Sequence, residues 1–356
     1  MELTVCIITK NERERLRSCL QALQGQDVEI VVVDTGSTDG TKEMVSDYTD
    51  RIFDFVWQDD FSLARNYAAS KASHDMIMML DSDEYVQEME LDALAKAVEE
   101  HAGMVGRIRR INLLDRDGEQ QEISEYISRI YDRRYYHYEG RIHEQIVPKV
   151  VAAEESSKDY RAYQTGVVVL HDGYCGSEAE LKAKVERNIT LLERELEAKG
   201  EDPYLCYQLG KSYYVAKDYA AAVAAFDRAL SQDLNPKLEY VIDMVQAYGY
   251  SLLKSGQTKR ALSLEGIYEE FGDTADFRFL MGLIYMNNGL FDHAVEAFLN
   301  ATKAKEAYTK GANSFLAYYN AGVICECLED YERAGKYYTA CGDYPRAKER
   351  LAAIGG

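Results

Sequence analysis

The sequence has little proline, little tryptophan and no long apolar run, and each shortage excludes a class of protein. Only four prolines and one tryptophan occur among 356 residues, which excludes a proline-rich, low-complexity chain. No apolar run reaches the roughly 18 residues that a membrane-spanning helix needs, so we expect no transmembrane segment. The chain starts directly in a strand pattern, without a basic and then apolar leader. We therefore expect a cytoplasmic protein.

Positive charge is also scarce. The 41 lysines and arginines are outnumbered by 61 aspartates and glutamates, which gives a net charge of -20. This sign is unfavourable for binding a nucleic-acid backbone or an anionic membrane, so we expect no nucleic-acid partner. An anionic ligand would have to be held by local positive charge or by a metal ion.

Cysteine is present in an odd number and without a regular spacing. The seven are mostly part of apolar patterns, which is typical of reduced thiols in a core and not of a disulfide framework. They are Cys6, Cys19, Cys175, Cys206, Cys325, Cys327 and Cys341.

The first half of the sequence alternates short apolar runs with helical patterns. Strands are predicted at 3–9, 29–34 and 76–80, and helices at 11–24, 38–48 and 62–72. The strands are continuous apolar runs, which is typical of a parallel sheet buried on both faces. Ligands of such sheets bind at the carboxyl ends of the strands, where the sequence has "TKNE", "DTGSTDG" and "DSDEY". Beyond residue 104, further strands are expected to extend the sheet in antiparallel fashion, at 105–114, 122–132, 136–147 and 166–174.

The second half is helical and repetitive. Small residues recur at two phases, spaced near the period of about 34 residues of the tetratricopeptide repeat. The first set is Gly210, Gly249, Gly282 and Gly322, and the second is Ala222, Ala261, Ala294 and Ala334. An aromatic residue stands at the turn in three of the four copies, and Gln257 replaces it in the second. The pattern predicts an all-α solenoid of about four repeats.

These two patterns predict an α/β domain over 1–175 and a repeat domain over 201–356. Apolar residues at helical spacing between them predict a connecting helix over 176–200. They are Leu181, Val185, Ile189, Leu192 and Leu196.

Acidic residues follow the third predicted strand without a break. Asp81 and Asp83 are two residues apart, so in an extended backbone both side chains leave on the same face. Two such carboxylates repel each other unless a cation or a proton lies between them, and oxygen ligands of this kind suit Mg²⁺ or Mn²⁺. A structural alternative is that the acids from Asp81 to Glu84 cap the helix that follows.

Nucleotide-binding motifs of other folds are absent. The segment "TKNERERL" after the first strand contains no glycine, so a dinucleotide cradle of the G-x-G-x-x-G type is excluded there. A P-loop is absent as well.

Three segments instead resemble family 2 glycosyltransferases of the GT-A fold, a Rossmann-like domain with a mixed sheet. They are "TVCIITKNERERLRSCLQAL", "VVVDTGSTDGT" and "FSLARNYAASKASHDMIMMLDSDE". The later "YYHYEGRIHEQI" and "VVVLHDGY" resemble the branch of that family that carries tetratricopeptide repeats and includes peptide S-glycosyltransferases. This resemblance implies a hexosyltransferase-type enzyme that uses a nucleoside-diphosphate sugar, for which a UDP-sugar is favoured, together with Mn²⁺ or Mg²⁺.

The resemblance also implies roles for single residues. A nucleoside pocket would be lined by Thr9, Asn11, Glu12 and Asp34, and Arg65 would approach the diphosphate. Asp81 would reach the ribose or the metal, and the metal ligands would be Asp81, Asp83 and His171. Family members commonly carry a second acid after the Asp34 position, where this chain has Thr35. An isolated histidine is more often a structural one, and the position of His171 at the end of a predicted strand is what favours a metal ligand outside the family context.

A transferase of this kind needs a base for the acceptor, and "GRIHEQ" offers two. We expect Glu144 to be the base, with His143 as its orienting partner or as the base itself; in a strand these neighbours would point to opposite faces. The alternative for Glu144 is a surface carboxylate paired with Arg141 or Lys149.

The sequence therefore predicts a metal-dependent, inverting glycosyltransferase. Its acceptor would be a peptide, a protein or a glycan, and the repeats would bind that acceptor or hold a homodimer together. Two alternatives stay open: a non-catalytic nucleotide-binding repeat adaptor, and a nucleotidyltransferase.

Overall fold

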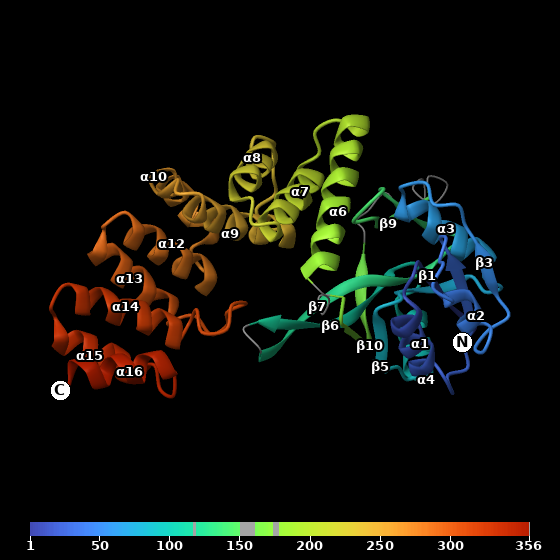
Figure 1. Ribbon diagram of the computed structural model, residues 1–356, viewed down its shortest axis with the longest axis horizontal. Coiled ribbons are helices and arrows are strands. Elements are labelled where there is room, and N and C mark those ends of the chain that lie inside the picture. The colour runs from blue at the N-terminus through green and yellow to red at the C-terminus, as the bar shows by residue number, and fades with distance from the viewer. Residues whose placement is uncertain (117–118, 150–160, 174–177, 356) are drawn as a thin grey trace. The chain divides into compact units, whose positions relative to one another are not determined.

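The chain folds into two compact units, which a computed structural model describes for residues 1–116, 119–149, 161–173 and 178–355. The first unit is Met1–Glu195 and the second is Leu196–Gly356. Both are drawn in Figure 1. The predicted domain end at residue 175, like the thiol of Cys175, lies outside the described residues. The other six cysteines are free, and five of them are buried.

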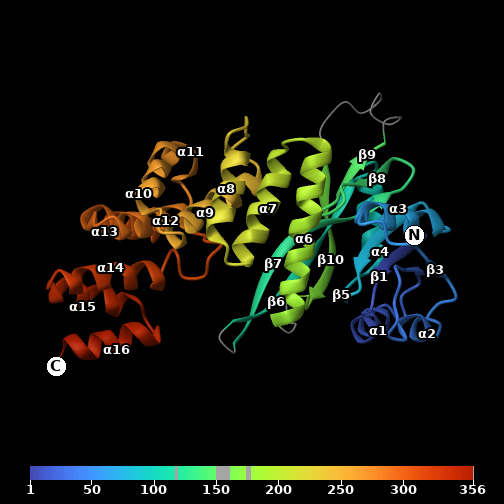
Figure 2. The same cartoon turned by 45° about the horizontal axis from the view of Figure 1, so that its top comes forward.

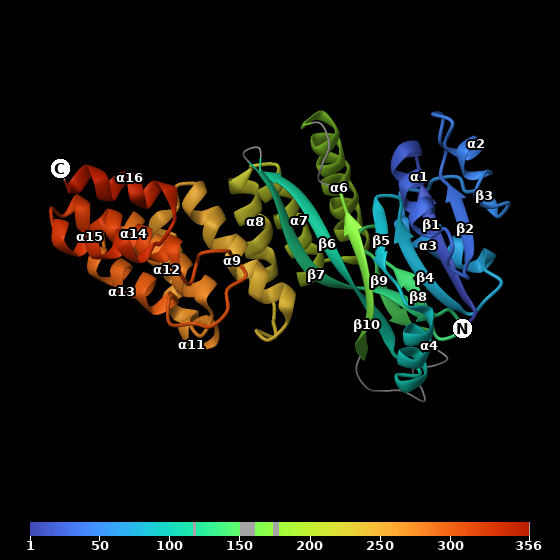
Figure 3. The same cartoon turned by 90° about the horizontal axis from the view of Figure 1, so that it is seen from below.

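The first unit is built on an eight-stranded mixed sheet with the order β3-β2-β1-β4-β7-β6-β10-β5. The strands are β1 (Leu3–Thr9), β2 (Glu29–Asp34), β3 (Ile52–Asp54), β4 (Met76–Asp81), β5 (Glu84–Glu88), β6 (Val105–Arg116), β7 (Glu119–Asp132) and β10 (Ala162–His171). β1 pairs in parallel with β2 and β4, and β7 is antiparallel to β4 and β6. The predicted mixed sheet is therefore confirmed, and Figure 3 shows β1, β2 and β3 at the end of the sheet that contains the N-terminus.

Three details of the sheet differ from the prediction. β10 pairs in parallel with β6 and antiparallel with β5, so the later strands do not all extend the sheet in antiparallel fashion. The segment predicted as one strand at 136–147 forms β8 (Tyr136–Glu139) and β9 (Gln145–Pro148), a separate two-stranded sheet. Neither β3, which has three residues, nor β5, which is mostly polar, was predicted, because neither carries an apolar run long enough for a periodic signal.

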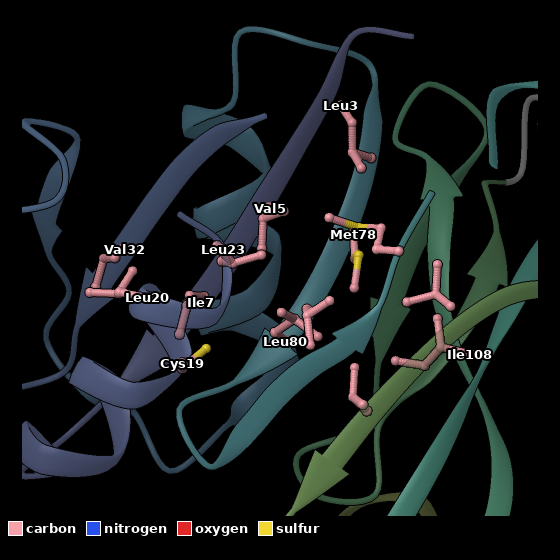
Figure 4. Close-up of a cluster of buried hydrophobic side chains, with 14 of the residues drawn as sticks. Leu3, Val5, Ile7, Cys19, Leu20, Leu23, Val32, Met78, Leu80 and Ile108 are labelled. Carbon is pink, nitrogen blue, oxygen red and sulfur yellow. The ribbon is translucent and has the colours of Figure 1, made fainter. Parts of the chain in front are cut away.

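Helices cover both faces of the sheet, as alternate residues of β1 require. Leu3, Val5 and Ile7 face a core cluster that also contains residues of α1 (Arg13–Ala22), α2 (Thr41–Val45) and α4 (Leu91–Glu100). Part of this cluster is drawn in Figure 4. Cys6 and Ile8 face the other cluster, which contains residues of α3 (Phe61–Lys71) and of the β8–β9 sheet. The parallel strands are buried on both faces, and their ends are the places left for a ligand.

The acids after β4 do not cap a helix. The N-cap residue of α4 is Glu90, and β5 separates that helix from the acids. Nor is the backbone extended between Asp81 and Asp83, because Ser82 and Asp83 form the turn between β4 and β5. The capping alternative and the same-face argument are therefore both wrong, and the two carboxylates point to different partners.

The second unit consists of paired helices in sequence order (Figure 2). Its helices are α7 (Pro203–Val215), α8 (Tyr219–Leu230), α9 (Glu239–Lys254), α10 (Thr258–Ala261), the 3₁₀ helix η1 (Leu262–Ile267), α11 (Tyr268–Phe271), α12 (Ala275–Asn287), α13 (Phe291–Ala301), α14 (Phe315–Cys327), α15 (Tyr331–Ala340) and α16 (Pro345–Ile354). The long α6 (Glu178–Lys199) carries the boundary between the units. No helix in the described ranges is both long and apolar enough to span a bilayer.

The recurring small residues are packing positions. A Cβ at Gly210, Gly282 or Gly322 would collide with an aromatic ring of the paired helix. The rings belong to Phe226, Phe298 and Tyr338. The four recurring alanines are fully buried. In the second copy, where Gln257 replaces the aromatic residue, the second helix is broken into α10, η1 and α11.

Candidate active site

The ends of the three central strands lie next to one another. Thr9 is in register with Asp34, and Ile8 is in register with Asp81. The structure thus brings together the polar segments that follow β1, β2 and β4, because adjacent parallel strands end at the same edge of the sheet.

The loops after β1 and β2 are joined by hydrogen bonds of Asn11. Its backbone N–H donates to Ser37 Oγ at 2.8 Å, and its Oδ1 accepts from the N–H of Thr38 at 2.8 Å. Asn11 has a positive φ of 54°, which asparagine adopts more readily than most residues. Thr35, in the place of the family's second acid, donates from Oγ1 to the carbonyl of Thr9 at 3.0 Å. Its hydroxyl is therefore used within the loop.

Two buried oxygens at these strand ends have no hydrogen-bond partner within the described part of the chain. They are Thr9 Oγ1 and Asp34 Oδ2. The other carboxylate oxygen of Asp34 accepts from the N–H groups of Gly36 and Ser37 at 2.9 and 2.8 Å. A buried acceptor without a donor is costly, so these atoms mark a place for a ligand that donates hydrogen bonds.

Asp81 is bound by two buried arginines. Arg65 Nη2 lies 2.7 Å from Oδ1, and Arg129 Nη2 lies 2.5 Å from Oδ2. Burial raises the pKa of Asp81, but the charges of Arg129 and Arg65 prevail and hold it well below its ordinary value. Both carboxylate oxygens are therefore occupied by guanidinium groups.

The fully buried Glu84 holds both Asp81 and Arg129 in place. Its carboxylate accepts from the backbone N–H of Asp81 at 3.0 Å, from Arg129 at 2.8 Å and from Arg110 at 3.2 Å. Sequence reasoning assigned no site role to Arg110 or Arg129. The one available signal was the presence of arginines among the apolar residues of "VGRIRRINLL" and "EISEYISRIYD".

Asp83 lies beside His171. His171 Nε2 is 3.5 Å from Asp83 Oδ2, and Nδ1 is 2.7 Å from Oδ1 of Asn112. Both side chains of the pair are buried. Burial raises the pKa of Asp83, yet its hydrogen bond with His171 brings the pKa below the ordinary value. With Nδ1–H donated to Asn112, the ring directs Nε2 at the Asp83 side. There Nε2 donates to the carboxylate, and a metal ion could take the place of that proton, as in metal-binding histidines.

The separation of His171 Nε2 and Asp83 Oδ2 fits a divalent cation. At 3.5 Å apart, the two atoms can both bind one ion at the about 2.0–2.2 Å of metal bonds to nitrogen and oxygen. A Cβ at Gly173 would collide with both atoms, so only glycine lets the backbone pass this close to the pair. No group of three His, Cys, Asp or Glu side chains suited to a metal occurs among the described residues. Asp83 and His171 therefore offer two ligands, and Asp81 faces arginines instead.

The segment with His143 and Glu144 lies between β8 and β9 and is not a strand. Glu144 is bound by Nε of Arg65, and its side chain is 9% exposed. The surface alternative for Glu144 is wrong, because Arg141 pairs with Glu195 at 3.0 Å and Lys149 donates to a backbone carbonyl.

His143 is held in an unusual state. Its φ is 51°, and its Nε2 is buried without a hydrogen-bond partner among the residues that the structure describes. Burial lowers the pKa of His143 to about 4. The imidazole is therefore neutral at physiological pH.

Comparison with known proteins identifies both units. Residues 4–150 match the glycosyl transferase family 2 model. Residues 203–236 and 279–348 match tetratricopeptide repeat models. The chain carries a family 2 glycosyltransferase domain followed by tetratricopeptide repeats. The family and the fold class predicted from the sequence are confirmed.

The relatives are described by one or the other of these two features. A TPR repeat-containing protein of Synechococcus elongatus is 29% identical over 237 residues, which are 65% of this chain and 57% of that protein. The SPbeta prophage-derived glycosyltransferase SunS of Bacillus subtilis is 25% identical over 302 residues, 81% of this chain and 68% of SunS. This chain thus matches less than two thirds of the length of the first relative. A solved structure, YrrB, described as a TPR protein with an unusual peptide-binding site, is 25% identical with a TM-score of 0.41, over 49% of this chain and 86% of YrrB.

Helix α6 adds groups to the site of this glycosyltransferase domain that sequence reasoning missed. Lys184 Nζ lies 3.8 Å from Asp83 Oδ2. Glu180 lines a cavity of about 340 Å³ together with Asn11, Glu12 and Arg15. The sequence pattern predicted the apolar residues of this helix. Glu180 and Lys184 are polar residues outside that apolar set, and their pattern is that of an ordinary solvated helix face.

Proposed function

We propose that this protein is a metal-dependent, inverting glycosyltransferase that moves a sugar from a nucleoside-diphosphate sugar to a peptide, protein or glycan acceptor. One observation carries the proposal. Within a family 2 glycosyltransferase domain, the turn before β5 and the end of β10 bring Asp83 and His171 together as a possible ligand pair, and α3 supplies a buried Arg65 that also binds a carboxylate, Glu144.

The nucleoside is proposed to lie against Thr9, Asn11, Glu12 and Asp34. The unpartnered oxygens of Thr9 and Asp34 accept hydrogen bonds, and a nucleobase with an N–H group satisfies them. A buried polar group that is paired only with the correct ligand discriminates strongly against ligands that lack the donor. The resemblance favours a UDP-sugar, whose uracil ring offers one such N–H; thymine and guanine rings offer one as well.

The diphosphate is proposed to meet Arg65. Its Nη1 is buried and has no hydrogen-bond partner within the described residues, whereas Nη2 and Nε bind Asp81 and Glu144. Mn²⁺ or Mg²⁺ would be held by Asp83 and His171, and Asp81 would have to leave an arginine to join them. The ion supplies positive charge to the diphosphate as it leaves, which stabilises the transition state more than the ground state.

Glu144 is the proposed base. An acceptor atom attacks the anomeric carbon, the bond from that carbon to the diphosphate breaks, and the acceptor proton passes to the Glu144 carboxylate. One displacement inverts the configuration of the sugar. His143 has a positive φ and a buried Nε2 without a partner among the described residues, and we assign it to the support of this segment.

The repeats are proposed to bind the acceptor or a second copy of the chain. Tetratricopeptide solenoids present concave surfaces that bind peptides and also dimerise. Acceptor binding by the repeats would explain why they are joined to a transferase domain.

A thermal-shift panel tests the donor site. The purified protein and its Asp83→Asn variant are heated with UDP-, GDP-, dTDP- and CDP-sugars and, separately, with the nucleoside triphosphates, each with Mn²⁺ or with EDTA. A donor raises the melting temperature because it binds the native state only. We expect one nucleotide to give a shift that needs Mn²⁺ and that disappears in the variant. If no sugar nucleotide shifts the wild type, the non-catalytic adaptor replaces the transferase. If nucleoside triphosphates alone do so, the nucleotidyltransferase replaces it.

The Glu144→Gln variant tests the base. Glutamine keeps an acceptor oxygen for Arg65 and cannot take a proton, so donor binding is expected to stay and turnover to fall by roughly 10² to 10⁴. Turnover is measured as nucleoside diphosphate released from the donor sugar. The control is His143→Asn, which suits a positive φ and is expected to keep turnover within about tenfold. The opposite result would assign the base to His143.

A further inference from the structure

Lys184 is a charged group of α6 that lies beside one of the proposed metal ligands. Its Nζ is 3.8 Å from Asp83 Oδ2, and the side chain is 42% exposed. Burial raises the pKa of Glu12, and the charges of Arg15 and Lys184 oppose that rise. Lys184 therefore lies near two acids of the proposed donor site, one after β1 and one after β4.

The other cations near the site are engaged in closer pairs. Arg65 and Arg129 are buried against Asp81, and Arg110 lies between Glu84 and Glu125. Arg15 lies 3.3 Å from Glu12 and 3.4 Å from Asp172. The pair of Lys184 with Asp83 is longer than these and more exposed. Such a pair contributes little stability, and the ammonium group can leave it at little cost.

Helix α6 is fixed to the glycosyltransferase domain, so the position of Lys184 is defined. Arg187 lies over the ring of Phe61 at 5.3 Å, at the start of the helix that carries Arg65. Arg194 pairs with Asp59 at 2.7 Å, and Glu195, which is 3% exposed, pairs with Arg141 at 3.0 Å. The helix is thereby joined to the α3 segment and to the segment that carries Glu144.

We propose that Lys184 binds the diphosphate of the sugar nucleotide and rests against Asp83 when no donor is bound. The proposal rests on the function proposed above. When a cation occupies the Asp83–His171 pair, the charge of Asp83 is neutralised and the lysine loses its partner. A diphosphate beside that cation offers several oxygen acceptors, and an ammonium group can donate three hydrogen bonds to them. Lys184 is then a binding residue whose ammonium group leaves the Asp83 carboxylate and binds the diphosphate.

The test compares diphosphates with nucleosides. Binding of UDP, GDP, dTDP and CDP, and of the matching nucleosides at millimolar concentration, is measured by calorimetry in the presence of Mn²⁺. For the diphosphate that the wild type binds, Lys184→Met is expected to weaken binding roughly tenfold to a hundredfold, as for the loss of a charge-assisted hydrogen bond. Affinity for its nucleoside is expected to stay the same. Lys184→Arg is expected to recover most of the loss.

Lys182→Met is the matched control. Lys182 is on the same helix and pairs with Glu186 in an exposed i,i+4 pair at 3.8 Å, so its removal changes the net charge equally and is expected to leave both affinities unchanged. Equal diphosphate affinity in Lys184→Met and wild type would overturn the proposal. So would an equal loss for diphosphate and nucleoside, which marks a structural role. If the wild type binds none of the ligands, the donor site itself is refuted, and the proposal falls with it.

Discussion

At the scale of single residues, the site is a set of buried charges that hold one another in place. Glu84 is fully buried, Arg65 and Arg129 are nearly so, and each is paired. Buried ion pairs gain little stability over apolar residues, but the removal of one partner costs several kcal/mol. We interpret this network as one that positions the turn with Asp83, and substitutions in it would change folding and binding together.

His143 makes a prediction about pH. Its pKa is lowered from 6.5 to about 4 by burial, so between these values the unfolded chain binds a proton that the folded chain does not. The free energy of unfolding therefore falls as the pH drops from about 6.5 towards 4, by at most about 3 kcal/mol from this group. His143→Asn should remove that part of the slope. Urea unfolding of both proteins at pH 7 and at pH 4.5 measures the change in the free energy of unfolding with pH. An equal change in the wild type and in His143→Asn would contradict a buried, neutral histidine.

The sequence predicted the residue types of the site better than their partners. Asp34, Asp81 and Asp83 were found because they follow strands, and the order of elements brings strand ends together. That Asp81 faces Arg65 and Arg129 depends on side chains separated by 16 and 48 positions. Such pairings are set by sheet register and packing, which leave no local pattern in the sequence.

At the scale of elements, glycine on the first helix of each repeat lets the second helix approach. Gly210, Gly282 and Gly322 each lie against an aromatic ring of the partner helix. This is why the repeat could be predicted from small residues alone, since each contact joins neighbours in the sequence. The β8–β9 sheet had no comparable signal, because its two strands are four residues long.

Gly210→Ala tests this packing. The methyl group would overlap the ring of Phe226, and we expect a loss of about 1–3 kcal/mol from overpacking. Gly266→Ala is the control, since its Cβ would meet nothing within 4 Å. Thermal unfolding of both variants, followed with and without the donor, separates the repeats from the transferase domain. Equal melting temperatures for the two variants would contradict the close approach.

At the scale of the whole molecule, the two units differ in how their sequences encode them. The repeats are built from contacts between consecutive helices, so the positions of the repeats can be predicted from the sequence. In the transferase domain, β10 lies between β6 and β5. No periodicity in the sequence predicts which strands lie next to each other in this way. Helix α6 shows both cases. Its apolar residues were predicted from their helical spacing, whereas its ion pairs with Asp59, Asp83 and Arg141 could not be predicted from the sequence.

The lack of a side chain at Gly173 suggests a variant that could be used to trap the acceptor. An alanine there would place a methyl group against both His171 Nε2 and Asp83 Oδ2 and force the two side chains apart. The substitution would disturb the proposed metal ligands without changing a charge or removing a ligand. A variant of this kind would keep its repeats, and it offers a way to capture an acceptor before the sugar is delivered.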